Sequence, residues 1–292
     1  MNLPDHFITE LQQLIEQARH VLPPAPPVVD LERGRAFRWR RHGRSAWLES
    51  VTDLSPIRLS DLQGVNRQKH AVDGNTRRFV HGLPANNVLL TGSRGTGKSS
   101  LVKALLNEYG DQGLRVIDVD KDLLIDLPDI VALVGGRSER FIIYCDDLSF
   151  TADDASYRAL KSILDGGLHA GSDNILIYAT SNRRHLLPEY MTDNTQTSVG
   201  EDGEIHPGEA VDDKISLSDR FGLWLSFYTM TQDLYLDIVR HWLGTYGLTL
   251  DDATRLAALQ WAQGRGNRSG RSAAQFVRDW AGKLREQHRQ HP

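Results

Sequence analysis

The amino-acid sequence predicts an α/β fold, with a mostly parallel sheet flanked by helices and a smaller helical region after it. Between about residues 60 and 188, apolar strand-like runs alternate with helical patterns, and this order is typical of parallel strands joined by helices. Residues 230–292 show the helical period alone. With 292 residues, 40% of them hydrophobic and 25% charged, the chain is long enough for one large core with smaller units attached.

The amino-acid composition of the chain narrows the classes of function that we expect for it. A formal net charge of -4 does not favour a general nucleic-acid coat or a membrane-surface protein. The single cysteine, Cys145, can form no intrachain disulfide and no cysteine cluster for zinc, and we expect it to pack as a small hydrophobe. No apolar run approaches the roughly 18 residues of a membrane span, and the acidic, amphipathic start is not typical of a secretion signal. We therefore expect a cytoplasmic protein without a membrane span.

The first predicted unit is residues 1–22, because apolar side chains recur at helical spacing over residues 5–22. The sequence PPAPP at 23–27 ends this helix and predicts a stiff linker. Beyond it, the residue pattern suits two short strands joined at His42-Gly43. Residues 23–59 are therefore interpreted as a linker and a short strand segment rich in arginine and aromatic residues.

The stretch Arg33–Arg44 has two interpretations. Its arginines are interleaved with aromatic residues, a pattern that is found in nucleic-acid patches with stacking rings. Alternatively, Phe37 and Trp39 are buried on one face of a strand while Arg38 and Arg40 lie in water. The sequence leaves both open, although the second needs no ligand.

The third predicted unit, residues 60–229, contains the sheet. Residues 192–213 within it are acidic and poor in large apolar groups, which predicts a mobile loop. Residues 230–292 form the fourth unit, where TQDLYLDIVRHWLGTYG and RSAAQFVRDWAGKLREQH predict amphipathic helices. The predicted strands of the sheet are NNVLLTG at 86–92, LRVIDVD at 114–120, FIIYCDD at 141–147 and NILIYATSN at 174–182.

A glycine-rich loop follows the first of these strands. It matches the pattern G-x-x-x-x-G-K-[ST], with an apolar strand before it and a helical pattern after it. Glycines let backbone N–H groups turn inward, the lysine can meet the β and γ phosphates, and the hydroxyl suits Mg²⁺. We expect Lys98 to lie on an exposed loop. The predicted phosphate-binding residues are Gly92, Ser93, Arg94, Gly95, Thr96, Gly97, Lys98, Ser99 and Ser100.

Polar residues at the ends of two neighbouring strands predict a magnesium and hydrolysis site. A nucleotide phosphate site of this kind needs a carboxylate for the magnesium shell at the end of a buried strand. FIIYCDD supplies Asp146, which we expect to hold Mg²⁺ together with Ser99, while Asp147 is the candidate that polarises the attacking water. Asn182, at the end of the next strand, is the candidate that reaches the γ-phosphate or that water. Strand-end turns are the structural alternative for all of these polar residues.

The segments GSRGTGKSS, FIIYCDD, ATSN and SLSDRFG, in that order, resemble the Walker A, Walker B, sensor 1 and arginine-finger segments of AAA+ ATPases. More narrowly, ANNVLLTG, YCDDLSF and YATSNRRHLLPEYM resemble the bacterial AAA+-like ATPase family catalogued as domain of unknown function 815. The resemblance runs from about residue 35 to 285. It implies a P-loop NTPase fold of the AAA+ type, a C-terminal helical lid subdomain, and ATP hydrolysis at a subunit interface.

The resemblance also implies roles for residues outside the glycine-rich loop. Arg220 in SDRFG, beyond the last predicted strand, resembles the arginine finger that points into the nucleotide of a neighbouring copy. Arg271, with Arg268 as the near alternative, resembles the sensor 2 arginine. Gly64 and Val65 lie in a segment that resembles the adenine cradle. Ion pairs or helix capping are the structural alternatives for the arginines.

One departure from the family pattern is Asp147, where many AAA+ proteins carry glutamate. We expect this shorter side chain to affect the rate of ATP turnover more than nucleotide binding. The leading hypothesis is a homo-oligomeric ATPase that uses Mg²⁺ and ATP, releases ADP, and remodels or loads a protein or nucleic-acid partner. The alternatives are a nucleotide-dependent switch or adaptor with negligible hydrolysis, and a small-molecule kinase. Guanine nucleotides are not expected, because no N-K-x-D motif follows the fourth strand.

Overall fold

The computed structural model describes most of the chain between residues 29 and 290. The predicted helix at 5–22 and the PPAPP linker lie outside the described residues, as does the predicted loop at 192–213 apart from two short strands. These strands, β7 (Ser198–Val199) and β8 (Ile205–His206), pair antiparallel. The described ranges are 29–150, 154–165, 173–183, 186, 198–199, 205–206 and 217–290.

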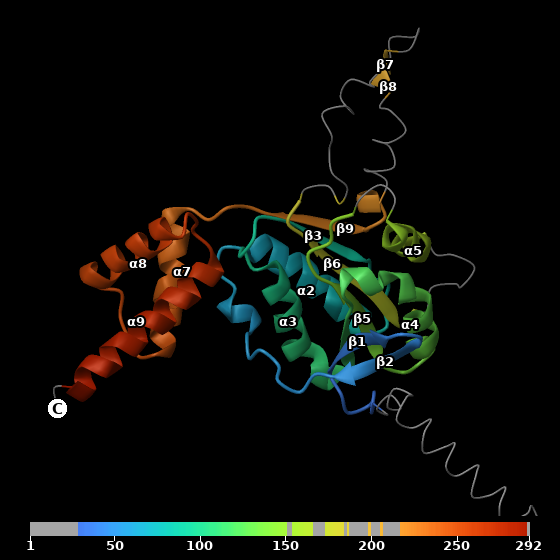
Figure 1. The fold of residues 1–292 in the computed structure, drawn as a ribbon, viewed down its shortest axis with the longest axis horizontal. Coiled ribbons are helices and arrows are strands. Elements are labelled where there is room, and N and C mark those ends of the chain that lie inside the picture. The colour runs from blue at the N-terminus through green and yellow to red at the C-terminus, as the bar shows by residue number, and fades with distance from the viewer. Residues whose placement is uncertain are drawn as a thin grey trace, which may run out of the picture.

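A seven-stranded sheet forms the main body of the molecule (Figure 1), in the order β2-β1-β4-β5-β6-β3-β9. The first two strands form an antiparallel hairpin, and every other neighbouring pair is parallel. The predicted α/β class with a mostly parallel sheet is thus confirmed. The strands are β1 (Ala36–His42), β2 (Ser45–Ser50), β3 (Val88–Gly92), β4 (Leu114–Asp118), β5 (Arg140–Cys145), β6 (Ile175–Ser181) and β9 (Leu223–Phe227).

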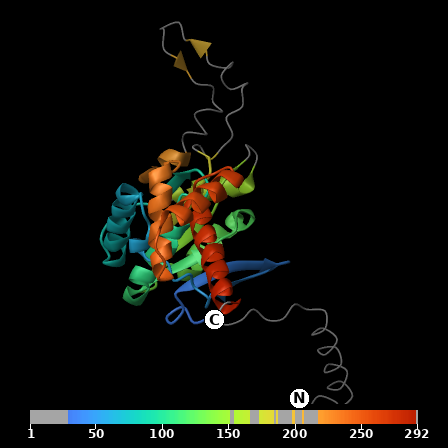
Figure 2. The ribbon, with the colours of Figure 1, turned by 90° about the vertical axis from the view of Figure 1, so that its left-hand side faces the viewer.

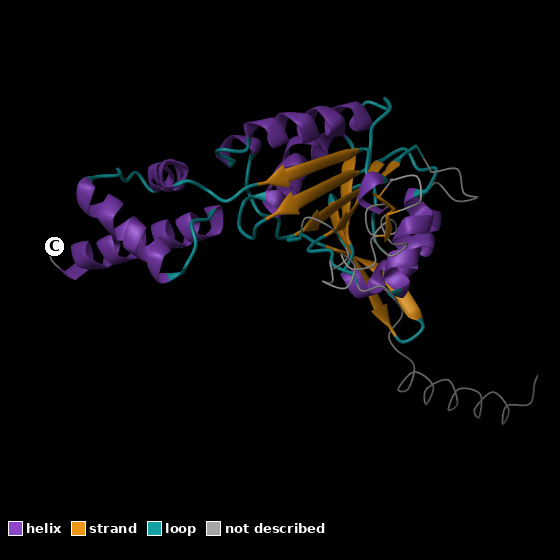
Figure 3. Cartoon of the chain, turned by 90° about the horizontal axis from the view of Figure 1, so that it is seen from above, coloured by secondary structure: helices purple, strands orange, loops and turns teal. Residues whose placement is uncertain are grey.

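Helices cover both faces of this sheet (Figure 3). Alternate residues of β5 enter different cores: Phe141 and Ile143 pack on the face that holds α4 and α5, whereas Ile142 packs on the face that holds α2 and α3. Apolar side chains on both faces explain why the strands are continuous apolar runs in the sequence. The helices and 3-10 turns of this body are η1 (Leu59–Asp61), α2 (Asn66–Val80), α3 (Lys98–Tyr109), η2 (Gly110–Gln112), η3 (Lys121–Asp126), α4 (Leu127–Val134) and α5 (Ala155–Leu164).

The C-terminal helices form a separate layer, which we call the lid: α7 (Gln232–Thr245), α8 (Asp252–Gly264) and α9 (Gly270–Gln290). The lid lies to one side of the sheet in Figure 1 and faces the viewer in Figure 2. It has a core of its own, with Tyr235, Val239 and Val277 fully buried. The predicted C-terminal helical region is confirmed, and its buried residues form a cluster distinct from the two cores of the sheet.

Strand β9 was not predicted, and it changes the place of Arg220. The arginine precedes β9, which pairs parallel with β3 through Val88↔Leu223 to Gly92↔Phe227. Arg220 therefore does not lie beyond the last core strand, as expected, but just before it. The sequence signal is weak because β9 is an edge strand whose residues are mostly half-buried.

Three arginines of β1 form ion pairs within the chain. Phe37 and Trp39 are buried as the structural interpretation requires, and carboxylates at 2.7–2.9 Å neutralise the arginines that alternate with them. This pairing favours the structural interpretation of Arg33–Arg44 over a nucleic-acid patch. The pairs are Arg38 with Asp118, Arg40 with Glu49 and Arg41 with Asp126.

None of the described helices combines the length and the apolarity that a membrane crossing requires.

Candidate functional site

The register of the sheet brings the ends of three strands together. Thr91 of β3 pairs with Ser181 of β6, and Cys145 of β5 pairs with Ala179 of β6. The residues that follow these strands therefore meet at the carboxyl edge of the sheet, where ligands of open parallel sheets bind. This edge carries the glycine-rich loop, residues 92–99, and the predicted acidic and amide side chains.

Glycines give the loop a shape that other residues cannot adopt. Gly92, Gly95 and Gly97 have φ values of 128°, 76° and 105°, which side chains rarely allow. A Cβ atom on Gly92 would lie 1.9 Å from the carbonyl oxygen of Phe227. Helix α3 begins directly after Gly97, so its N-terminal N–H groups, which favour anions, face the turn.

Lys98 is buried rather than exposed, which corrects our expectation. Its side chain belongs to the first turn of α3, is 5% exposed, and donates to the carbonyl oxygens of Gly92 and Ser93 at 2.5 and 2.9 Å. It also donates to Asn182 Oδ1 at 3.1 Å. Burial lowers the pKa of Lys98, although the charges of Asp146 and Asp147 oppose this shift. The ammonium group is thus fixed at the mouth of the loop.

Asp146 accepts hydrogen bonds from the loop helix and from two strands. Ser99 Oγ and Tyr144 OH each lie 2.8 Å from its Oδ1, and Thr180 Oγ1 donates to the same oxygen. Burial alone would raise the pKa of Asp146, but the hydrogen bonds from Thr180, Tyr144 and Ser99 hold it below the ordinary value. The carboxylate is therefore ionised and oriented toward Ser99.

This oxygen set fits a magnesium ion. Mg²⁺ prefers oxygen ligands and is commonly bound by one or two protein groups plus phosphate oxygens and water. Ser99 and Asp146 supply such a hydroxyl and carboxylate side by side. Within the described residues, no three His, Cys, Asp or Glu side chains cluster as a metal site.

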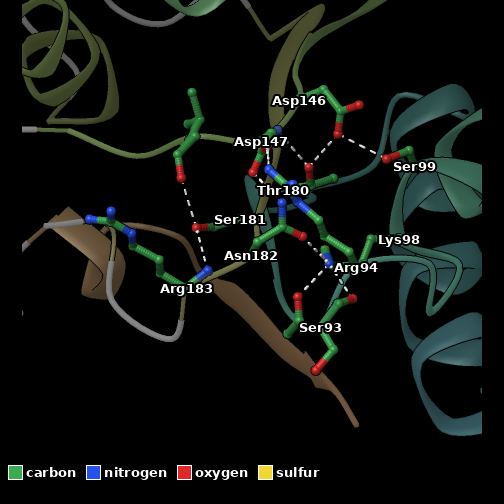
Figure 4. A network of polar contacts seen from close by, with 12 residues as sticks. Ser93, Arg94, Lys98, Ser99, Asp146, Asp147, Thr180, Ser181, Asn182 and Arg183 are labelled. Carbon is green, nitrogen blue, oxygen red and sulfur yellow. Dashed lines mark hydrogen bonds and ion pairs between the residues drawn. The ribbon is translucent and has the colours of Figure 1, made fainter. Parts of the chain in front are cut away.

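Asp147 lies at the centre of a second polar group (Figure 4). Its backbone has φ of 54°, the left-handed region that aspartate tolerates better than most residues. The N–H group of Asp147 is held by Thr180 Oγ1 at 2.9 Å. One carboxylate oxygen accepts from Asn182 Nδ2, and the other accepts from Arg94 Nη2 at 3.2 Å. The structure thus places Asp147 and Asn182 together and adds Arg94 of the loop.

A cleft of about 510 Å³ lies between the loop and the lid. Arg271 of the lid lines this cleft together with Lys98, Asp146 and Asp147. Gly270, the first residue of α9, donates its N–H to the carbonyl oxygen of Gly95 at 2.9 Å. Among the candidates outside the loop, Val65 and Arg271 line the cleft; Gly64 and Arg268 are not among its described lining residues. Position therefore favours Arg271 over Arg268 as the lid arginine near the loop.

Arg220 lies at the other end of the sheet. It precedes β9, whose first residue pairs with Val88, whereas the loop follows the last residue of β3. Arg220 contacts Asp165 and lines a second cavity of about 1170 Å³ beside the starts of β5 and β6. The structure does not bring Arg220 together with Lys98 of the same chain.

Tyr144 and Thr180 are two site residues that the sequence did not single out. Tyr144 lies two residues before Asp146, and the period of a strand puts both on one face. Thr180 lies two residues before Asn182 in the same way. The alternation was therefore a usable signal. Cys145, between Tyr144 and Asp146, is fully buried. Burial raises the pKa of its thiol, in keeping with a packed hydrophobe.

The fold resembles those of solved AAA+ proteins. RuvB of Thermotoga maritima, a Holliday junction branch migration motor, matches with TM-score 0.52 and 16% identity over 76% of this chain and 63% of its own. The FIGL-1 AAA domain in complex with ADP gives 0.53 and 16% over 81% and 76%. The replication initiator DnaA, bound to AMPPCP and single-stranded DNA, gives 0.53 and 17% over 82% and 70%.

The matched part of this chain spans less than two thirds of the RuvB chain. No curated protein matches the sequence. A family model described as "Protein of unknown function (DUF815)" matches residues 32–284. The chain therefore belongs to the DUF815 family, and its fold is that of the AAA+ ATPases.

Proposed function

We propose that this chain binds Mg²⁺ and ATP in the cleft between the glycine-rich loop and the lid, and hydrolyses the nucleotide. The observation that carries this proposal is the meeting of Lys98, Asp146 and Asp147 at one sheet edge, with Arg271 across the cleft. A phosphate chain needs fixed cations and inward N–H groups, and hydrolysis needs a held carboxylate near them. These groups are all present within the cleft lining.

In this proposal each side chain has a distinct task. Lys98 and the N–H groups of the loop bind the β and γ phosphates. Ser99 and Asp146 hold Mg²⁺, which when bound neutralises charge on the phosphate oxygens. Asp147 accepts a hydrogen bond from the attacking water, because a carboxylate offers about four lone-pair sites and the two contacts to Arg94 and Asn182 leave the others free.

The rest of the proposal concerns neighbouring copies of this chain and a client, the macromolecule on which the protein would act. Arg220 would act on the nucleotide of a neighbouring copy, which its distance along the sheet from its own loop supports. The lid, tied to the loop through Gly270 and Gly95, would pass the state of the nucleotide to a macromolecular client. The fold similarity to a branch migration motor and a replication initiator supports a macromolecule over a small acceptor molecule.

Substitution of Lys98 tests the nucleotide site. Lys98→Met keeps the length of the side chain and removes its charge, so we expect ATP affinity to fall by about 10-fold or more, the scale of a lost charge-assisted hydrogen bond. Lys283→Met, on the exposed part of α9, is the matched control. Titration of a fluorescent ATP analogue measures both, and thermal unfolding shows that each variant is folded. Wild-type affinity in a folded Lys98→Met protein would remove the assignment.

The contacts of Asp147 favour a second candidate, a nucleotide-dependent switch with negligible hydrolysis. Both of its carboxylate oxygens are engaged, and aspartate is one methylene shorter than the glutamate of many AAA+ proteins. Steady-state turnover separates the two functions. A wild-type rate equal to that of Asp147→Asn, at every protein concentration, would favour the switch.

A further inference from the structure

Two side chains of the glycine-rich loop reach the end of β5: Ser99 contacts Asp146, and Arg94 contacts Asp147, the next residue. Arg94 is the third residue of the loop, its side chain is 75% exposed, and its Nη2 lies 3.2 Å from Asp147 Oδ2. Nothing in the loop pattern requires an arginine at this position, because the pattern fixes only the glycines, the lysine and the hydroxyl. The role of this guanidinium must therefore follow from what it contacts.

The contact is the end of a continuous polar chain across the loop (Figure 4). Arg94 donates to Asp147, Asn182 donates to the other oxygen of Asp147, and Lys98 donates to Asn182. An ammonium group can only donate and a carboxylate can only accept, so the amide of Asn182 has one possible orientation. Asp147 is thus held from two sides by two groups that belong to different segments of the chain.

The carboxylate needs such restraint. The side chain of Asp147 is 49% exposed, and the left-handed backbone, with φ of 54°, fixes only the direction of its Cβ atom. Without partners, an exposed aspartate samples several rotamers. The backbone beside Arg94 is itself anchored, because Gly95 accepts a hydrogen bond from Gly270 of the lid at 2.9 Å. Asn182 restrains one oxygen of this carboxylate, and Arg94 restrains the other.

We propose that Arg94 is a positioning residue, which orients the carboxylate of Asp147 for the attacking water. This inference rests on the proposed hydrolysis and deepens it. Arg94 acts through Asp147 rather than on the phosphates, so its loss affects turnover and leaves nucleotide affinity nearly unchanged. A carboxylate that is displaced by about 1 Å can cost up to 10²-fold in rate, and because Asn182 still holds one oxygen, the expected loss is about 10-fold.

A double-mutant cycle tests the proposal. Arg94→Ala, Arg94→Lys, Asp147→Asn and Arg94→Ala/Asp147→Asn are compared with wild type by single-turnover hydrolysis and by titration with a fluorescent ATP analogue. We expect Arg94→Ala to lower turnover about 10-fold with ATP affinity within about 3-fold, and Arg94→Lys to recover part of the rate, since lysine keeps the charge without the fork. In the Asp147→Asn background, where the amide fits the same backbone, removal of Arg94 should change turnover less than about 2-fold. Arg255→Ala, on the exposed face of α8, is the control for loss of a surface arginine.

Each of the other outcomes of this cycle contradicts a defined part of the proposal. An equal loss in both backgrounds, or a large loss of ATP affinity, means that Arg94 contacts the phosphates directly and overturns the positioning role. A faster Arg94→Ala enzyme means that the ion pair holds Asp147 back, and an unchanged rate means that the contact has no role; both overturn it. If wild type binds ATP without any turnover, hydrolysis fails and the positioning role fails with it, whereas the nucleotide site stands.

Discussion

The two ends of the sheet differ in the number of polar side chains that they bring together. At the carboxyl end, side chains from the glycine-rich loop, β5 and β6 form one connected network around Lys98 and Asp147. At the amino end, Arg220 contacts Asp165 beside a large cavity, far along β3 and β9 from the loop. In our proposal the carboxyl end provides a nucleotide site from one chain, and the amino end provides a single group for the site of another.

In our proposal, this difference is the physical reason for an oligomer. An arginine is always charged and its planar fork suits a phosphoryl group. Arg220 cannot serve its own cleft without leaving its place before β9, because the pairing of β9 with β3 fixes it at the opposite edge. A second copy that docks its amino end against the cleft resolves the conflict.

The largest expected effect is that of Arg220→Ala. Loss of an arginine supplied by a neighbour costs about 10³-fold or more in turnover, with little change in ATP affinity. In a mixture of Arg220→Ala and Lys98→Met proteins, at an ATP concentration too low to occupy the Lys98→Met site, activity should return, because an intact cleft of the first can receive the arginine of the second. Turnover should also depend on protein concentration. A wild-type rate per subunit that does not change on dilution would contradict the action of Arg220 on a neighbouring copy.

The ion pair with Asp165 provides a matched control. Asp165→Asn removes the same ion pair and keeps the arginine. A structural role for the pair predicts that both variants lose activity alike, whereas action on a neighbour predicts that Asp165→Asn retains most of its turnover. Thermal unfolding of both variants measures the part of the effect that is due to stability.

A smaller effect is expected at the carboxyl end for Asp147→Asn. Loss of a positioned general base costs about 10²-fold or more in turnover, while Mg²⁺ and ATP should still bind. Asp146→Asn should instead weaken the dependence of ATP binding on Mg²⁺. Unlike Arg220→Ala, Asp147→Asn should not be rescued by Lys98→Met, because both defects lie in the same cleft and no subunit would hold an intact one. Rescue of that mixture would mean that the carboxyl end is also shared between copies.

The smallest effect is expected for Asp118→Asn, at the carboxyl end of β4 but outside the network. Burial raises the pKa of Asp118 above 3.8 despite the hydrogen bond from Arg38. The folded state then binds the proton more tightly than the unfolded one, so the contribution of Asp118 to stability is full below pH 3.8 and is lost as the pH rises through the raised pKa. Asp118→Asn should melt higher at pH 8 by up to about 2 °C, with no gain near pH 4. Calorimetry at the two pH values checks this, and a lower melting temperature at pH 8 would contradict it.

Much of the carboxyl end could be predicted from the sequence, because each of its segments is a local pattern. The strands β3, β4, β5 and β6 are continuous apolar runs, and Asp146, Asp147 and Asn182 follow such runs directly. Once the strands are parallel, their ends must share one edge. The fold class, the loop and these polar residues therefore needed no tertiary information.

The contacts between segments could not be predicted in this way. Arg94 and Asp147 are 53 residues apart, and their pairing depends on the left-handed backbone of Asp147, for which one residue gives no signal. Lys98 belongs to a glycine-rich stretch that resembles an exposed loop, yet carbonyl groups of its own loop and Asn182 enclose it. The edge strand β9 is mostly half-buried, so its apolar signal is weaker than that of the buried strands. These features arise from packing and not from periodicity.

Helix α9 gives the lid a mechanical property. It spans 21 residues, which corresponds to about 30 Å at 1.5 Å per residue, and its first residue is bonded to the glycine-rich loop. A rigid rod of that length, pivoted at the loop, sweeps its far end through about 5 Å for a tilt of about 10°. Helix α9 can therefore act as a lever arm, with its first residue at the glycine-rich loop and its far end away from it. If the lid acts on a client as proposed, the displacement of that far end grows with the length of α9, so inserting or deleting whole turns near it would change the displacement without altering the nucleotide site.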